Sequence, residues 1–122
     1  MTSCESNTLL RSESKLNQRI QATWQVEIRP LSDPNGLEDW IFSNNSFFVI
    51  RYINNVADTV NTGAYAISTT WSKSYMMVSG VIPTNPELET KWEILILDDK
   101  TLSMTRTYGG GGGSTYEFTK KN

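Results

Sequence analysis

The sequence predicts an all-β protein, an eight-stranded antiparallel meander barrel preceded by a short N-terminal helix. Apolar and polar residues alternate over 22–29, 40–42 and 47–53, the pattern of strands with one buried and one solvated face. The alternation recurs almost to residue 119, interrupted mainly by short runs of turn-forming residues. A sheet of this length must curl, and eight strands enclose an interior just wide enough to be filled or to hold one small ligand.

The first twenty residues lack this alternation. Residues 1–8 are mostly polar, and we expect them to form a disordered tether ahead of a barrel domain spanning 9–122. Leu9, Leu10, Leu16 and Ile20 follow a loose helical spacing, and no Pro or Gly interrupts them. The pattern therefore predicts a short amphipathic helix over 9–20 that plugs or caps one end of the barrel.

Turn-forming residues divide the rest of the chain into strands. Asn44-Asn45 suits a two-residue hairpin loop, the polar stretch 54–61 marks the next turn region, and the prolines of 83–87 cannot continue a strand ladder. The strands predicted between these and the remaining turns are 23–29, 38–43, 46–53, 63–70, 74–82, 91–97, 101–108 and 115–120.

Composition excludes several classes of function. The chain has 122 residues, enough for one domain with a real core. Its 11 basic and 13 acidic residues are scattered along the chain, unlike the concentrated basic stripe that nucleic acids require. The sequence has no histidine and a single cysteine, Cys4, which excludes histidine-based catalytic triads, thiolate zinc sites and an intrachain disulfide. No carboxylate pair has surroundings that would separate its pKa values, so we expect neither an enzyme nor a cofactor or metal.

Aromatic residues at strand positions provide the candidate ligand site. In one interpretation they form an apolar cup for a small hydrophobic molecule or a lipid. In the other, the same rings simply fill the lumen, since each buries a couple of hundred square ångströms. The residues assigned to the lining by strand parity are Trp24, Trp40, Phe42, Tyr52, Tyr65 and Met77.

Two arginines lie inside predicted strands among apolar neighbours. Either Arg51 or Arg106 can point inward and bind a ligand carboxylate through a bidentate pair. Alternatively, the guanidinium stacks on a tryptophan as a structural cation–π contact. Leu102, Met104 and Arg106 share one strand face, so we keep Arg106 among the candidate ligand-binding residues while favouring the structural role.

The glycine run 109–113 has the composition of a phosphate-binding loop. Such loops lead into a helix whose N-terminus binds the anion, whereas these glycines lead into the predicted strand 115–120. We therefore interpret the run as a hairpin tip near the barrel mouth. A synthetic linker has the same composition.

The N-terminus resembles a site of lipid attachment. Met1-Thr-Ser-Cys4 is similar to the end of a bacterial lipobox, where an export signal is cleaved before a cysteine that becomes lipidated, and polar residues 5–8 resemble the tether that follows. This interpretation predicts a lipid on Cys4, a location in the cell envelope and membrane association only through that anchor. The alternative is an ordinary cytosolic start with a chance cysteine.

Over about residues 16–119 the chain resembles the lipocalin-like domains of small exported proteins and lipoproteins of Bacteroidetes-type bacteria. The motifs that carry the resemblance are Trp24, Trp40-Ile-Phe42, Gly63-Ala-Tyr-Ala-Ile67 and Trp92-Glu-Ile94. Classical lipocalins differ in having a glycine where this chain has Ala22, and commonly a disulfide. The resemblance implies a calycin-like barrel, an envelope location, a small apolar ligand and a late-strand arginine, Arg106, packed over Trp24.

Three functional hypotheses follow. The first is a non-enzymatic binding module of the envelope that holds a small hydrophobic molecule or lipid in the barrel. The second is a protein-interaction or inhibitor module, in which a filled barrel presents the loops 31–37 and 83–90, because recognition often resides in loops on a rigid scaffold. The third, an enzyme on an α+β cone, requires more helix after residue 21 than the sequence predicts.

Overall fold

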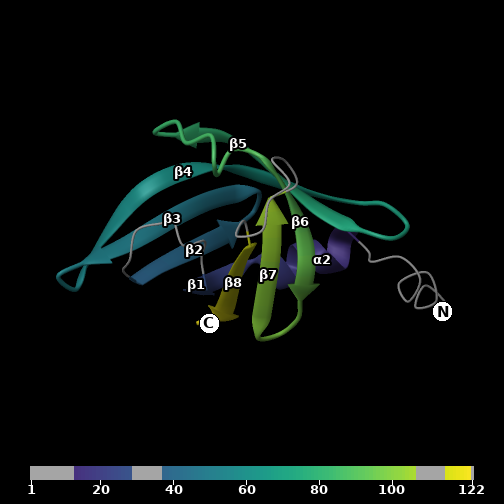
Figure 1. Cartoon of the computed structure of the whole chain (residues 1–122), viewed down its shortest axis with the longest axis horizontal. Helices are drawn as coiled ribbons and strands as arrows, with labels where there is room; N and C mark the ends of the chain where they lie inside the picture. The colour runs from purple at the N-terminus through teal and green to yellow at the C-terminus, as the bar shows by residue number, and fades with distance from the viewer. Residues whose placement is uncertain (1–12, 29–36, 107–114, 122) are drawn as a thin grey trace.

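The computed structural model describes residues 13–28, 37–106 and 115–121. This part of the chain forms one short helix and eight strands, which pair in sequence order into a closed antiparallel barrel (Figure 1). The elements are α2 (Glu13–Ile20), β1 (Ala22–Ile28), β2 (Leu37–Ser43), β3 (Ser46–Ile53), β4 (Val56–Thr69), β5 (Ser74–Ile82), β6 (Lys91–Leu97), β7 (Thr101–Arg106) and β8 (Thr115–Lys120).

Closure of the barrel depends on β1, which pairs with both β2 and β8. Trp24 lies opposite Trp40 on one side and opposite Lys120 on the other. Every strand therefore has two neighbours, and the sheet has no unpaired edge to template aggregation. The predicted eight-stranded meander barrel is confirmed.

Two hairpins turn on asparagine pairs with left-handed backbone. Asn44 and Asn45 have φ angles of 47° and 69°, and Asn54 and Asn55 have φ angles of 53° and 65°. Asparagine tolerates this region, which two-residue hairpin loops require. The loop at Asn44-Asn45 agrees with the predicted hairpin. The loop at Asn54-Asn55 is shorter than the turn region predicted over 54–61.

The predicted turn over 54–61 is wrong beyond Asn55, because β4 already begins at Val56. Its first residues pair with β3 from Ile53 opposite Val56 to Arg51 opposite Asp58. Residues 56–59 are all exposed, apolar Val56 and Ala57 included, so this part of the hairpin is solvated on both faces. The alternation that identifies a half-buried strand is therefore missing here.

Helix α2 plugs one end of the barrel, as the sequence predicted. Leu16 and Ile20 are buried, and the carbonyl of Ile20 accepts a 2.8 Å hydrogen bond from the indole Nε1 of Trp24. At the start of the helix, the Glu13 carboxylate accepts a hydrogen bond of 3.3 Å from the backbone N–H of Thr69. Residues 9–12 of the predicted helix lie outside the described residues.

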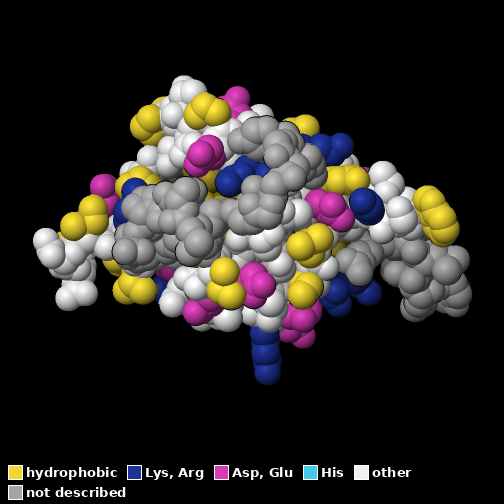
Figure 2. Space-filling model, viewed as in Figure 1, with side chains coloured by type: hydrophobic (Ala, Val, Ile, Leu, Met, Phe, Trp, Pro, Cys, Tyr) yellow, Lys and Arg dark blue, Asp and Glu magenta, His cyan; other side chains and the backbone are white. Residues whose placement is uncertain are grey.

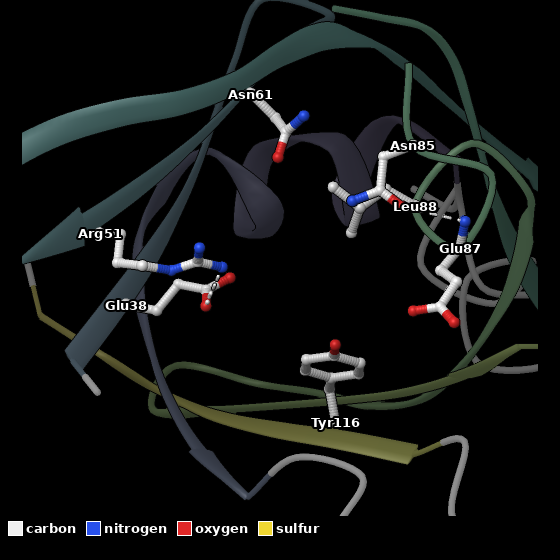
Figure 3. A pocket seen from close by; sticks show the side chains of 7 residues that line it. All are labelled: Glu38, Arg51, Asn61, Asn85, Glu87, Leu88 and Tyr116. Atoms are coloured by element: carbon white, nitrogen blue, oxygen red, sulfur yellow. Dashed lines mark hydrogen bonds and ion pairs between the residues drawn. The ribbon is translucent and has the colours of Figure 1, made fainter. Parts of the chain in front are cut away.

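The two ends of the barrel therefore differ, and we name them the helix end and the mouth. β4 connects them, with Thr69 at the helix end and Asn61 at the mouth. Figure 3 looks into the mouth, with α2 at the far end of the lumen. On the face seen in Figure 2, basic and acidic side chains of the described residues are interspersed.

Candidate functional site at the barrel mouth

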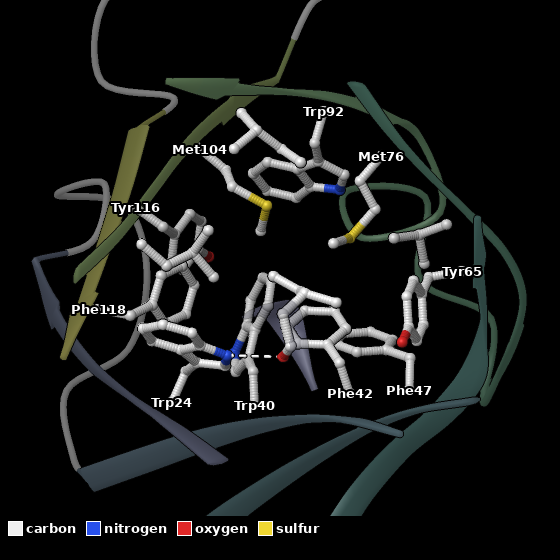
Figure 4. Packing of buried hydrophobic residues seen from close by; sticks show 14 of the residues in the cluster. Trp24, Trp40, Phe42, Phe47, Tyr65, Met76, Trp92, Met104, Tyr116 and Phe118 are labelled. Atoms are coloured by element: carbon white, nitrogen blue, oxygen red, sulfur yellow. Dashed lines mark hydrogen bonds between the residues drawn. The ribbon is translucent and has the colours of Figure 1, made fainter. Parts of the chain in front are cut away.

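Aromatic rings fill the centre of the lumen (Figure 4). Trp40 lies at the centre of this packing, with its ring centroid 5.3 Å from that of Phe47 and 5.8 Å from that of Trp92. Phe42 stacks on Phe47 at 5.1 Å, and Phe118 lies 5.0 Å from Trp40. Edge and stacked contacts at these distances are the favourable geometries for aromatic pairs. Strand parity therefore brings the rings together, and there they pack against one another.

Four of the predicted lining residues belong to this core. Trp24, Trp40, Phe42 and Tyr65 are at most 3% exposed. Burial raises the pKa of the Tyr65 hydroxyl above its ordinary value, because the charged phenolate is poorly solvated there. These four positions were predicted correctly as inward-facing, and their surfaces are covered by protein.

Met77 was wrongly assigned to the lining. Its side chain is 47% exposed on the outer face of β5, while the neighbouring Met76 is fully buried. Ser74 pairs with Thr69 on β4 and with Ile94 on β6, and this register turns Ser74, Met76 and Val78 inward. Two adjacent methionines give no alternation from which to choose, so the sequence pattern alone did not identify the buried one.

Tyr52 also faces outward, where it joins a polar cluster. Its hydroxyl donates to Asp39 at 2.9 Å, and the Lys121 ammonium donates to the same carboxylate oxygen at 2.8 Å. The Lys121 Nζ also lies 5.2 Å from the centroid of the Tyr52 ring. The cluster fastens the C-terminal end of β8 to the outer face of β2 and β3, and its role is structural.

Arg106 points inward at the mouth and makes the expected cation–π contacts. Its guanidinium carbon lies 5.4 Å from the centroid of the Trp92 ring and 6.0 Å from that of Tyr116. The predicted partner, Trp24, is wrong, because that indole lies at the helix end and bonds to Ile20. The expected cation–π contact of Arg106 is present, with the Trp92 ring nearest to the guanidinium.

A cavity of about 200 Å³ opens above the aromatic core at the mouth (Figure 3). The hydroxyl of Tyr116 points from β8 toward the middle of this cavity (Figure 3). Among the described residues, side chains from four strands and from the β5–β6 connection line it: Glu38, Arg51, Asn61, Asn85, Glu87, Leu88 and Tyr116.

A buried glutamate and a half-buried arginine form one wall of the cavity. The Glu38 carboxylate accepts a 2.8 Å hydrogen bond from the Trp40 indole and a 3.4 Å bond from the Arg51 guanidinium. The Glu38 side chain is 8% exposed and that of Arg51 34%. A carboxylate this deeply buried requires such charge-assisted partners. The pair therefore fixes the guanidinium at the cavity wall.

The opposite wall is residues 83–90, the connection between β5 and β6. Leu88 is buried in the mouth, and its carbonyl accepts a 3.2 Å hydrogen bond from the Trp92 indole. The connection is also fixed at Asn85, whose carbonyl accepts bonds from the N–H groups of Leu88 and Glu89, and at Pro83, whose carbonyl accepts one from Asn61. These bonds give the connection a defined shape.

The mouth contains hydrogen-bond donors and acceptors, and its charged side chains include both acidic and basic groups. Glu38 and Glu87 balance the guanidinium groups of Arg51 and the nearby Arg106, while Asn61 and Asn85 add neutral amides. Such a site suits a small, uncharged or zwitterionic polar molecule better than an apolar one. Within 13–28, 37–106 and 115–121, no group of three or more acidic, cysteine or histidine side chains is placed to hold a metal ion.

The sequence indicated only part of this site. Arg51 was named from the sequence as a possible inward-facing arginine, whereas Glu38 was missed, although its parity with Trp40 and Phe42 was the signal that could have identified it. No local pattern distinguishes Asn61, Asn85 and Leu88, because they reach the mouth only when the barrel closes. Cys4, the glycine run 109–113 and most of the loop 31–37 lie outside the described residues.

Across the described residues, no helix is both long and apolar enough to cross a membrane. Comparison of the chain with family models, with curated proteins and with solved structures found no match.

Proposed function

We propose that the protein is a non-enzymatic binding module of the bacterial cell envelope, anchored by a lipid on Cys4 and recognising a small polar ligand at the barrel mouth. The observation that carries the proposal is the polar cavity above a filled aromatic core. Its volume of about 200 Å³ lies below the range of about 300 to 1,000 Å³ typical for drug-sized ligands. The fitting ligand is therefore small.

A neutral sugar ring has the chemistry that the mouth complements. Hydroxyl groups both donate and accept, which matches the Glu87 carboxylate, the Asn61 and Asn85 amides and the Tyr116 hydroxyl. The balance of two acidic against two basic side chains favours no net charge on the ligand. Leu88 offers an apolar contact for one face of the ring.

A lipid in the lumen, the ligand first expected from the sequence, fits this arrangement less well. It would have to displace rings that already contact one another at about 5 Å, such as Phe42 on Phe47 and Tyr65 on Phe42. Closely packed interiors resist such displacement, because each lost contact is felt in stability.

Recognition of a protein partner is the second candidate function. It is favoured by the fixed shape of residues 83–90, which presents Thr84, Pro86 and Glu89 to solvent on a hydrogen-bonded frame. A preformed loop binds without first paying the entropy of ordering. The second candidate predicts that Thr84→Gly with Pro86→Ser, which leaves the cavity residues Asn85 and Glu87 in place, abolishes capture of an envelope protein without changing monosaccharide binding.

Ligand-observed saturation-transfer NMR tests the sugar proposal. Glucose, galactose and N-acetylglucosamine are mixed with the full chain, and we expect at least one to show transfer and a measurable Kd. Tyr116→Phe removes only the hydroxyl that points into the cavity. It should raise this Kd by about 2- to 10-fold, the worth of one hydrogen bond.

Asp99→Asn, in the exposed turn at the helix end, is the matched control and should leave the Kd unchanged. Palmitate is tested in parallel. Binding of palmitate with no response from any sugar would overturn the polar-ligand proposal in favour of an apolar cargo. Mass spectrometry of the native protein tests the anchor independently, since an unmodified Cys4 contradicts it.

A further inference from the structure

Trp71 is 80% exposed, the highest exposed fraction among the large hydrophobic side chains of the described residues, whereas the other three tryptophans are at most 1% exposed. A tight turn holds its ring away from the barrel. The N–H of Thr70 donates to the carbonyl of Lys73 at 2.8 Å, and the Thr70 hydroxyl accepts from the N–H of Lys73 at 3.0 Å. The exposure of this indole is therefore built into the backbone of the β4–β5 turn.

Two further apolar side chains lie toward the same end of the neighbouring strand. Ser74 at the start of β5 pairs with Ile94 on β6, so Leu95 and Ile96 continue along β6 toward the level of the turn. They are 44% and 48% exposed. We call Trp71, Leu95 and Ile96 the turn patch. An indole with an apolar body and one N–H, flanked by aliphatic residues, suits the interface between lipid and water.

The N-terminal segment enters the described structure beside this patch. Helix α2 begins at Glu13, and its carboxylate bonds to Thr69, two residues before Trp71. Figure 1 likewise shows the end of the β4–β5 hairpin beside α2. Eight residues lie between Cys4 and Glu13, and a chain of that length spans at most about 30 Å. A lipid on Cys4 would thus keep the start of α2, which bonds to Thr69 near the β4–β5 turn, within about 30 Å of the bilayer.

We propose that the turn patch docks onto the surface of the lipid bilayer and orients the barrel there. This inference rests on the Cys4 anchor of the proposed function and goes beyond it, because an anchor alone leaves the barrel free to rotate. A short tether holds the patch at an effective concentration in the millimolar range, so a weak contact suffices. The mouth, at the opposite end of β4, then faces away from the membrane toward soluble ligands.

The contact is apolar rather than electrostatic. Lys73, the basic residue next to the turn, lies 3.9 Å from Glu93, which offsets its charge near the patch. We therefore expect docking on uncharged phosphatidylcholine, with little dependence on salt. A surface that bound anionic lipids would instead weaken as salt rises.

The single cysteine and the single exposed tryptophan allow a direct test. The full chain is coupled through Cys4 to a maleimide-bearing lipid in phosphatidylcholine vesicles, and tryptophan fluorescence is recorded. Because Trp24, Trp40 and Trp92 are buried, quenching by added acrylamide reports mainly on Trp71. Coupling should reduce acrylamide quenching at least 2-fold, and vesicles with brominated acyl chains should quench the emission. Both responses should disappear in Trp71→Phe.

The double variant Leu95→Ser, Ile96→Ser keeps the fluorescent reporter and should restore most of the acrylamide quenching. Ile82→Ser, a 69% exposed site at the mouth, is the control and should behave like the unchanged chain. Equal quenching of Trp71 before and after coupling would overturn docking. Chemical coupling makes this test independent of natural lipidation. An unmodified Cys4 in the native protein would reject the natural anchor, whereas the vesicle experiment tests whether the turn patch itself contacts lipid.

Discussion

At the scale of single residues, the buried carboxylate of Asp39 makes the folded protein sensitive to alkaline pH. Its hydrogen bond to the Tyr52 hydroxyl is the main reason that the pKa of Tyr52 lies above its ordinary value of 10.0. Its hydrogen bond to the ammonium likewise raises the pKa of Lys121 above 10.5. Both groups hold their proton more tightly in the folded state. Their contribution is therefore complete below about pH 10 and is lost as the pH rises through the folded-state values.

The variant Tyr52→Phe should weaken this dependence of stability on alkaline pH. Loss of the hydrogen bond to Asp39 should reduce the free energy of unfolding at pH 8 by about 1 kcal/mol. The further loss between pH 9 and 11 should be smaller than in the unchanged protein, because one of the responsible groups is gone. Urea denaturation at several pH values measures both effects. Tyr75→Phe, on the outer face of β5, is the control, and identical pH slopes in all three proteins would contradict the argument.

At the scale of elements, α2 acts as a stopper for the lumen. Only Leu16 and Ile20 of its eight residues are buried, and the helix is too short to be stable alone in water. Its order therefore comes from packing against the barrel and from the bond between its last carbonyl and the Trp24 indole. The sequence predicted the plug from the spacing of the same apolar residues.

Ile20→Ala should destabilise the barrel by about 2 to 5 kcal/mol, as expected for truncation of a fully buried aliphatic residue. Gln18→Ala on the exposed face of α2 should change stability by less than about 0.5 kcal/mol. Denaturant midpoints of the two variants test the difference. Equal midpoints would mean that α2 is not part of the cooperative unit.

At the scale of the whole molecule, stability comes from the convergence of rings from six different strands on one enclosed space. Each strand contributes inward residues only at alternate positions, so the interior depends on register throughout the barrel. Adjacent phenylalanines on β3 illustrate this, since Phe47 is fully buried and Phe48 faces the outer side and is half-buried.

Phe47→Ala should cost about 3 to 5 kcal/mol, because it leaves a cavity beside Trp40 and Phe42. Phe48→Ala removes the same atoms from the outer face and should cost markedly less. Calorimetric unfolding of the pair measures the difference. A larger loss for Phe48→Ala would contradict the assigned inward face of β3.

The sequence by itself determined the number of strands, their meander order, the helical plug and the inward positions of Trp24, Trp40, Phe42 and Tyr65, because alternation and turn chemistry are local properties of the chain. The start of β4 at Val56 was missed, since its first residues are exposed on both faces. Tertiary structure decided which of Met76 and Met77 is buried, since the pairing register of β5 sets that choice. It also decided that the rings fill the lumen and that Glu38, Arg51 and Asn85 meet at the mouth. These outcomes depend on how side chains from strands far apart in sequence pack together in one interior. A local sequence pattern contains no information about such packing.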